Sequence, residues 1–331
     1  MKLCKVDENN VDVLMATYNG EKYIAEQIES ILNQTYKSFK LIISDDCSND
    51  NTLEIIQHYS KLDSRIIYQT NSSNIGVIKN FEKLIGLSNS KHFMLCDQDD
   101  VWYPNKIEKS LTAISNNEVL LMYSDLEIVN SQLVTQADSY WRRKKIKPIK
   151  GEQWRLLLSL NIVTGCTIIA RRELKNLVLP FPNHVEMHDS WLALAASTSD
   201  GIDFIDESLL MYRQHQNNYI GIVNKNKLYE SKKYNDFLQL RSAFLIEKET
   251  QLLSYAKHIS NNEFKVSSEQ LSKIYRLSGK IKYFNCSLSM LYTKLHFPSQ
   301  GLSRNLWWIF YLQFPIFSFI LIKLRSIIRS F

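Results

Sequence analysis

The sequence predicts an α/β protein in which a mostly parallel sheet is flanked by helices. In the first half, short apolar runs alternate with segments whose apolar residues recur at helical spacing. Strands that alternate with helices in this way indicate βαβ units and a parallel sheet. A second observation is the acidic sequence Asp97-Gln98-Asp99-Asp100, which directly follows the apolar run 92–96. Because ligands of open α/β sheets bind at the carboxyl ends of the strands, this sequence marks a candidate binding edge.

The elements of the first half follow from their apolar patterns and flanking residues. Strands are expected at 11–17, 39–44, 66–68 and 92–96. Helices are expected at 21–33, 51–59, 77–87 and 104–115. The helix at 51–59 has Asp50 or Asn51 as its cap, and Pro104 suits the first turn of the helix that it opens.

The regular alternation of strands and helices ends near residue 120. Strands are expected at 120–124 and 165–170, a helix at 190–197, and a late strand pair at 203–206 and 208–212. The stretch from 223 to 295 is mostly helical in pattern. We therefore divide the chain into a domain at 1–222, a helical region at 223–300 and a membrane-associating segment at 301–331.

Composition sets broad limits on the class of protein. Hydrophobic residues make up 45% and charged residues 22% of the 331 positions, which is ordinary for a globular protein and disfavours global disorder. The net charge of +6 is modest, and no recognition motif for nucleic acid accompanies it. The 5 cysteines are scattered without paired spacing, which favours a reducing compartment. The first ten residues hold no apolar core of signal-peptide length, so we expect a cytoplasmic protein.

The segment 306–322 stands apart because it carries no charge and is followed by Lys323, Arg325 and Arg329. It falls just short of the ~20 residues that a spanning helix needs, and Pro315 interrupts it. Aromatic residues and a basic tail favour an interfacial or re-entrant anchor on the inner face of a membrane. The alternative is a helix buried against the protein's own core.

The basic segment 142–150 has several interpretations. A solvated loop is the ordinary one for a run of charges. A contact with a diphosphate or with anionic lipid headgroups is the functional alternative. Nucleic-acid binding is weaker than either.

Polar and acidic residues follow each of the strands expected at 11–17, 39–44 and 92–96. Carboxylates that lie this close repel one another unless a cation joins them, and a divalent metal carrying a diphosphate suits such a corner. Taken alone, Asp45-Asp46 is equally well explained by turn and helix-cap chemistry. Motifs for a Rossmann dinucleotide site, a P-loop and a hydrolase nucleophile elbow are missing from the sequence.

The motifs, in order, resemble those of the family 2 glycosyltransferases, which are inverting, nucleotide-sugar-dependent enzymes of the GT-A fold. The resemblance covers about the first two-thirds of the chain. It is carried by Ala-Thr-Tyr-Asn-Gly at 16–20, Ile-Glu-Ser-Ile-Leu-Asn-Gln-Thr at 28–35, Ser-Asp-Asp-Cys-Ser-Asn-Asp at 44–50, Asn-Ile-Gly at 74–76 and Asp-Gln-Asp-Asp-Val-Trp-Tyr-Pro at 97–104. The form of the last motif and Tyr-Arg-Gln-His-Gln-Asn-Asn at 212–218 most resemble bacterial rhamnosyltransferases and related enzymes of surface-polysaccharide synthesis.

The resemblance implies roles for individual residues on the donor side. Tyr18 and Asp46 would hold the nucleobase, Asp97 would lie close to the ribose and sugar, and Asp99 and His215 would bind Mn²⁺ or Mg²⁺. The full set of implied donor-binding residues is Thr17, Tyr18, Asn19, Asp45, Asp46, Gly76, Asn80, Asp97 and Asp100.

On the acceptor side, the resemblance makes Asp189 the base that deprotonates the attacking hydroxyl. A carboxylate at a helix N-terminus is stabilised as the anion that a base must be. Local pattern alone explains Asp189 equally well as a helix cap. Trp191 and Trp102 are either sugar-stacking platforms or core residues. The implied acceptor-side residues are Gly165, Cys166, His188 and Trp191.

These expectations together describe an inverting, metal-dependent hexosyltransferase. Its donor would be a dTDP- or UDP-sugar, with L-rhamnose favoured over glucose or galactose. Its acceptor would be a saccharide, carried on a polyprenyl diphosphate at the membrane. A sugar-nucleotide hydrolase or nucleotidyltransferase, which would not need Asp189, and a non-catalytic glycan-binding relative remain as alternatives.

Overall fold

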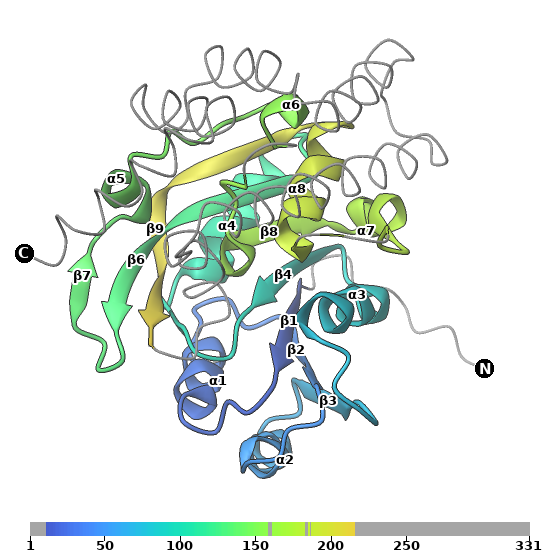
Figure 1. The fold of residues 1–331 in the computed structure, drawn as a ribbon, viewed down its shortest axis with the longest axis vertical. Helices are drawn as coiled ribbons and strands as arrows, with labels where there is room; N and C mark the ends of the chain where they lie inside the picture. Colours follow the sequence, from blue (N-terminus) through green and yellow to red (C-terminus); the bar gives the residue numbers. More distant parts are fainter. Residues whose placement is uncertain (1–10, 158–160, 183–184, 186, 216–331) are drawn as a thin grey trace, which may run out of the picture. The chain divides into compact units, whose positions relative to one another are not determined.

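The computed structural model describes residues 11–157, 161–182, 185 and 187–215 (Figure 1). The chain divides into two compact units, and the first comprises residues 1–143, 148–181 and 185–213. Nearly all described residues belong to this unit. The helical region predicted at 223–300 and the membrane-associating segment at 301–331 lie outside the described residues. Within the described part of the chain, no helix is both long enough and apolar enough to cross a bilayer.

The first half of the first unit forms the parallel part of the sheet. Strands β3 (Ile66–Thr70), β2 (Phe39–Asp45), β1 (Val11–Thr17) and β4 (His92–Cys96) lie side by side in that order, and all three pairings are parallel. The predicted bounds of β1 and β4 are confirmed. Helices α1 (Ile24–Leu32), α2 (Thr52–Leu62) and α3 (Val77–Leu87) connect these strands.

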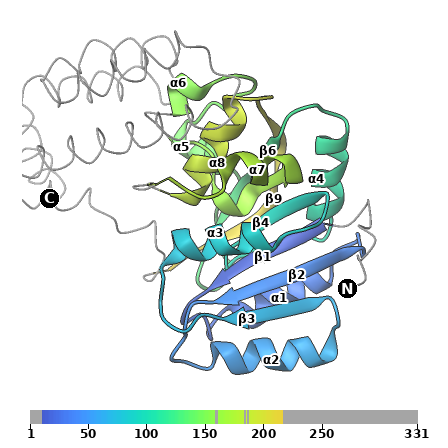
Figure 2. The same cartoon turned by 90° about the vertical axis from the view of Figure 1, so that its right-hand side faces the viewer.

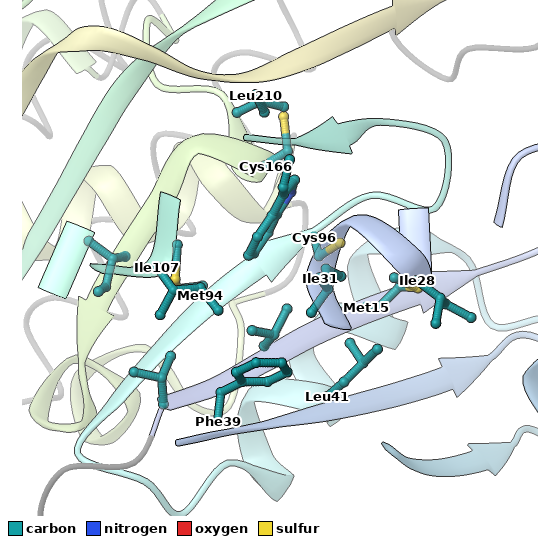
Figure 3. Packing of buried hydrophobic residues seen from close by; sticks show 14 of the residues in the cluster. Met15, Ile28, Ile31, Phe39, Leu41, Met94, Cys96, Ile107, Cys166 and Leu210 are labelled. Carbon is teal, nitrogen blue, oxygen red and sulfur yellow. The ribbon is translucent and has the colours of Figure 1, made fainter. Parts of the chain in front are cut away.

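Alternate residues of β1 face opposite sides of the sheet, as the pleat requires. One core cluster contains the buried face of α1 together with Val11, Val13 and Met15. Leu14 is also buried, but it lies outside this cluster. Figure 2 shows α1 and α3 on opposite sides of the parallel strands. Figure 3 shows the cluster from close by, with Cys96 near the apolar side chains of α1. Two helical layers therefore bury both faces of β1, which accounts for its continuous apolar sequence.

The second half adds antiparallel strands to the other side of β4, so the sheet is mixed. The order continues β8 (Ile168–Arg171), β6 (Leu121–Asn130), β9 (Ile202–Gln214) and β5 (Val101–Trp102), and β7 (Thr135–Ala137) pairs with β6. Pairings β4–β8, β6–β8, β6–β7 and β5–β9 are antiparallel. The expectation of a mostly parallel sheet is therefore wrong for this half.

Two predicted elements differ from those in the structure. The strand pair expected at 203–206 and 208–212 is one continuous strand, β9, because no turn-forming residue separates the two runs. The strand expected at 165–170 begins with a short 3-10 turn, η1 (Gly165–Thr167), before β8. The remaining helices are α4 (Lys106–Ser115), α5 (Tyr140–Lys144), α6 (Trp154–Leu157), α7 (Arg172–Val178) and α8 (His188–Ser197).

Candidate active site

The carboxyl ends of β1, β2 and β4 carry the polar residues that the sequence singled out. Thr17 lies opposite Asp45 in the β1–β2 register, and Met15 lies opposite Cys96 in the β1–β4 register. The loops that follow these strands therefore emerge at one edge of the sheet. This edge is the expected ligand site of such a fold.

The first two loops are joined by side-chain hydrogen bonds. The Thr17 hydroxyl donates to Asp45 Oδ1 at 3.0 Å, and Asp45 Oδ2 accepts the backbone N–H of Ser48 at 3.0 Å. The backbone N–H of Asn19 donates to Ser48 Oγ at 2.9 Å. Tyr18 is 42% exposed beside these bonds, so its ring is available to a ligand. Asp45 is buried and orders the two loops.

Asp46 is buried and holds the loop between β3 and α3. Its Oδ1 accepts from Asn71 Nδ2 at 2.8 Å and from the N–H of Ile75 at 2.9 Å, and its Oδ2 accepts from the N–H of Gly76 at 2.8 Å. Gly76 has φ of 83°, a conformation that favours glycine. Asn80 donates from Nδ2 to the carbonyl of Ser44 at 2.8 Å. These bonds give Asp46, Gly76 and Asn80 a clear structural role, while their contacts with a donor remain predictions.

The acidic corner is formed by the three carboxylates that follow β4. Asp100 is fully buried, and Asp97 and Asp99 are partly exposed. The ligand atoms of Asp97, Asp100 and Cys166 all lie within 4.8 Å of one another. Burial and the charges of Asp99 and Asp189 raise the pKa of Asp97 to about 7. A divalent cation would relieve this repulsion, so the carboxylates fit Mg²⁺ or Mn²⁺ by charge and by ligand type.

Cys166 brings a sulfur atom to the acidic corner that a hard cation does not favour. Burial, with the charges of Asp100 and Asp97, raises the pKa of the Cys166 thiol well above its ordinary value. Cys166 therefore stays a thiol, which suits hydrogen bonding to the carboxylates better than metal coordination. Its acceptor-side role remains a prediction.

Two buried cations are hydrogen-bonded to residues of the acidic corner, and sequence reasoning missed both. Lys106 Nζ donates to the carbonyl of Cys166 at 3.0 Å and lies 4.7 Å from the ring centroid of Trp102. Arg213 Nε donates to the carbonyl of Asp99 at 2.8 Å, and the N–H of Arg213 donates to Asp100 Oδ1 at 3.2 Å. Arg213 thereby ties the end of β9 to the acidic corner. His215 directly follows the last residue of β9, and its role as a metal ligand remains a prediction.

Asp189 lies in the first turn of α8, which begins at His188, before the start predicted from the sequence. The side chain is 3% exposed. Its Oδ1 accepts from Asn161 Nδ2 at 2.9 Å, and its Oδ2 accepts from the N–H of Gly165 at 3.1 Å. Because Gly165 precedes Cys166 in η1, this bond places Asp189 beside the acidic corner. No local signal in the sequence indicates the partner Asn161.

Two aromatic residues close to Asp189 in the sequence, His188 and Trp191, are part of the core. His188 is 3% exposed and stacks on Phe81 with ring centroids 4.0 Å apart. Burial lowers the pKa of His188 to about 3, so the imidazole is neutral. Trp191 is fully buried and donates from Nε1 to the carbonyl of Val178 at 3.1 Å. Trp102 is 2% exposed. The structure thus favours the core alternative for both tryptophans over sugar stacking.

The raised pKa of Asp97 predicts a pH dependence of stability. The folded chain holds this proton to a higher pH than the unfolded chain, so folding loses stability as the pH rises from the ordinary value of 3.8 through about 7. For metal-free protein in EDTA, we expect the unfolding temperature to fall between about pH 5 and about pH 8. Each kcal/mol lost from the free energy of unfolding lowers this temperature by about 2–4 °C. Asp97→Asn should make the fall smaller in calorimetry. Equal falls in both proteins would contradict this origin.

The fold and the site define the class of the protein as a GT-A-type glycosyltransferase. The chain belongs to glycosyltransferase family 2, because the family described as "Glycosyl transferase family 2" matches residues 12–177. This confirms the resemblance drawn from the motifs.

The chain is also similar to two curated glycosyltransferases. The chain is 30% identical over 236 residues to the UDP-Glc:alpha-D-GlcNAc-diphosphoundecaprenol beta-1,3-glucosyltransferase WfgD of Escherichia coli, covering 70% of this chain and 87% of WfgD. It is 31% identical over 220 residues to the dTDP-rhamnosyl transferase RfbG of Shigella flexneri, covering 62% of this chain and 73% of RfbG.

Solved structures confirm the fold. The S. aureus TarS fragment in complex with UDP-GlcNAc matches with a TM-score of 0.54 and 18% identity, over 86% of this chain and 87% of that one. The mannosyltransferase PcManGT from Pyrobaculum calidifontis, in complex with GDP-Man and Mn²⁺, matches with a TM-score of 0.53 and 12% identity, over 95% and 86% of the two chains. At these identities the likeness concerns the fold alone.

Proposed function

We propose that this family 2 glycosyltransferase moves a sugar, with inversion, from a UDP- or dTDP-activated donor to a hydroxyl of a polyprenyl-diphosphate-linked saccharide. The names of WfgD and RfbG support a lipid-linked acceptor and these two nucleotides. L-Rhamnose is our first choice of donor sugar, and glucose is the second. The segment 306–322 and its basic tail would hold the enzyme on the inner face of the membrane that carries the acceptor.

The observation that carries the proposal is the short connection between the predicted base and the acidic corner. Asp189 accepts the N–H of Gly165, and the sulfur of the next residue, Cys166, lies within 4.8 Å of carboxylate oxygens of Asp97 and Asp100. The charge of Asp189 also contributes to the raised pKa of Asp97. This proximity suits a displacement in which the base takes the proton of the attacking hydroxyl while the acidic corner holds the leaving diphosphate through a cation.

The reaction then follows from the positions of these groups. Asp189 takes the proton of the acceptor hydroxyl, whose oxygen forms a bond to the anomeric carbon of the sugar. The bond from that carbon to the diphosphate breaks, and its electron pair leaves with the nucleoside diphosphate. When bound, the divalent cation would offset the negative charge that builds on the leaving group. Asn161 and Gly165 orient the carboxylate, because each donates one hydrogen bond to it.

A donor panel tests the proposal most simply. The unfolding temperature of the full chain is measured with UDP-glucose, UDP-galactose, dTDP-L-rhamnose and GDP-mannose, each with and without Mn²⁺. We expect stabilisation by a UDP- or dTDP-sugar that requires the metal, and transfer of that sugar to a lipid-linked acceptor. Release of free sugar with the acceptor present and unmodified would instead indicate a hydrolase.

Gly165 provides a test of the acceptor-side geometry. A Cβ atom at this position would lie 2.8 Å from His188 Nε2 and 3.6 Å from Asp189 Cβ. Because His188 is buried against Phe81, it has little room to move, and the 3-10 turn must shift away from Asp189. Gly165→Ala should therefore cost about 1–3 kcal/mol of stability and reduce kcat by roughly tenfold, since loss of a well-placed partner misorients the base.

Gly86 offers the matched control for this substitution. It lies within α3, and the nearest atom to a Cβ there is Leu179 Cδ1 at 3.9 Å. Gly86→Ala should leave kcat unchanged and stabilise the helix by up to about 1 kcal/mol. If Gly165→Ala retained the kcat of the unaltered enzyme, the close approach at Gly165 would have no part in placing the base.

A further inference from the structure

Gln98 lies between the acidic residues Asp97 and Asp99, and its side-chain amide is bound at both ends to one backbone residue. The N–H of Tyr18 donates to Gln98 Oε1 at 2.9 Å, and Gln98 Nε2 donates to the carbonyl of Tyr18 at 3.0 Å. The pair resembles one rung of an antiparallel ladder, made by a side chain from 80 residues away in the sequence. An amide is the side chain that can both donate and accept here, whereas a carboxylate would leave the carbonyl of Tyr18 without a donor.

Gly20 provides the space that this pairing needs. A Cβ atom at Gly20 would lie 2.3 Å from Gln98 Oε1 and 2.5 Å from its Cδ. Because the amide is bonded at both atoms, it is not the free end of a flexible side chain and could move aside only by breaking those bonds. The Gln98 side chain therefore packs directly against the loop that follows β1.

That loop is itself joined to the loop that follows β2. The N–H of Asn49 donates to Asn19 Oδ1 at 2.9 Å, in addition to the bond from Asn19 to Ser48. Asn19 has φ of 49°, in the left-handed region that asparagine tolerates better than most residues. The two loops expected to hold the nucleobase thus form one hydrogen-bonded unit, and Gln98 connects this unit to the acidic corner.

We propose that Gln98 is a positioning residue that couples nucleoside binding to metal binding, an inference that rests on the proposed function. A nucleoside that orders the Tyr18 loop would also order the backbone between Asp97 and Asp99 through the two hydrogen bonds. A cation bound by these carboxylates would in turn order the Tyr18 loop. Each ligand then binds more tightly when the other is present, because the free energy of coupling between two sites is reciprocal.

Titration calorimetry of the full chain tests this coupling. UDP and dTDP are each titrated in EDTA and in Mn²⁺, and the nucleotide that binds more tightly in Mn²⁺ is used for the variants. For the unaltered protein we expect Mn²⁺ to tighten nucleotide binding by at least about tenfold, within the usual range of coupling. In Gln98→Ala and Gln98→Met, the tightening should be at least about threefold smaller than in the unaltered protein, while the affinity in EDTA changes by less than about threefold. Part of the tightening should remain in both variants, because the cation also attracts the diphosphate directly.

Gln136→Ala is the matched control, because Gln136 is an exposed glutamine in β7 that donates from Nε2 to the carbonyl of Val134 at 3.4 Å. It should show the full tightening by Mn²⁺, and the unfolding temperatures of all variants report whether the fold is kept. Full tightening in both Gln98 variants would overturn the inference and leave the proposed function standing. An equal loss of nucleotide affinity with and without metal would also overturn it, because Gln98 would then support the nucleotide site without linking it to the metal site. If the unaltered protein bound neither nucleotide in Mn²⁺, the proposed function would fail, and the inference with it.

Discussion

Asp189→Asn is expected to reduce kcat for sugar transfer by at least about a hundredfold, because the amide cannot accept the proton of the attacking hydroxyl. The amide is close in size to the carboxylate, so the first turn of α8 should persist. The proposed donor site lies at the strand ends, so binding of UDP or dTDP with Mn²⁺ should stay within about threefold of the unaltered enzyme. Steady-state kinetics and calorimetry on the same preparation measure the two effects.

The control for this substitution is Asp200→Asn, which makes the same chemical change at an exposed position shortly after α8. It should leave transfer unchanged. Near-normal turnover in Asp189→Asn would show that another group accepts the proton, although the donor site could still be as described. The structural alternative, a helix cap, predicts lost stability without a selective loss of kcat.

Asp99→Ala is expected to abolish the metal dependence of nucleotide binding and to cut transfer by at least about a hundredfold. The reason is that removal of one carboxylate takes away a cation ligand as well as the charge that attracts the cation. The metal-free protein should not lose stability, since Asp99 contributes to the raised pKa values of its neighbours Asp97 and Asp100. Manganese titration and thermal unfolding check both expectations.

Asp138→Asn serves as the control for Asp99, because Asp138 is an exposed carboxylate whose ion pair with Arg142 lies on the surface. Surface pairs of this kind contribute about 0–1 kcal/mol. The substitution should alter neither metal binding nor transfer. Unchanged metal-dependent binding of the nucleotide by Asp99→Ala would remove Asp99 from the proposed cation site.

The parallel half of the fold could be predicted closely from the sequence because its signals are local. The bounds of β1, β4 and α3 are those expected, since each apolar run ends at a polar or small residue. The antiparallel half could not be predicted as well. The place of β9 in the sheet depends on pairing with β5, and η1 is joined to α8 by the bond from Gly165 to Asp189. Both are distant partners that no local pattern reports.

The same distinction applies to the candidate site. The acidic sequence after β4 is a local signal, and the resemblance to a family supplied Asp189. The groups that orient these carboxylates come from distant parts of the chain, and this is why the roles of Lys106, Arg213 and Asn161 were not predicted. Physical reasoning from the structure also limits what the motif implied, because burial of Trp191 favours a core role over sugar stacking.

The charge distribution supports the proposed cation at this site. Carboxylates gather at the end of β4, and the buried cations of Lys106 and Arg213 donate hydrogen bonds to the carbonyls of Cys166 and Asp99. These buried charges therefore fix the shape of the acidic corner, while the partly exposed Asp97 and Asp99 keep a negative face toward solvent. This face would repel a diphosphate, and a bound divalent cation would offset that repulsion.

Anomalous diffraction from crystals grown with Mn²⁺ and the preferred nucleoside diphosphate tests the central claim directly. The account predicts an anomalous peak for a manganese ion that is bonded to a carboxylate oxygen of Asp99 and to the diphosphate. The nucleobase should pack against Tyr18. A manganese ion bound away from the ends of β1, β2 and β4, or a nucleotide bound elsewhere on the protein, would contradict it.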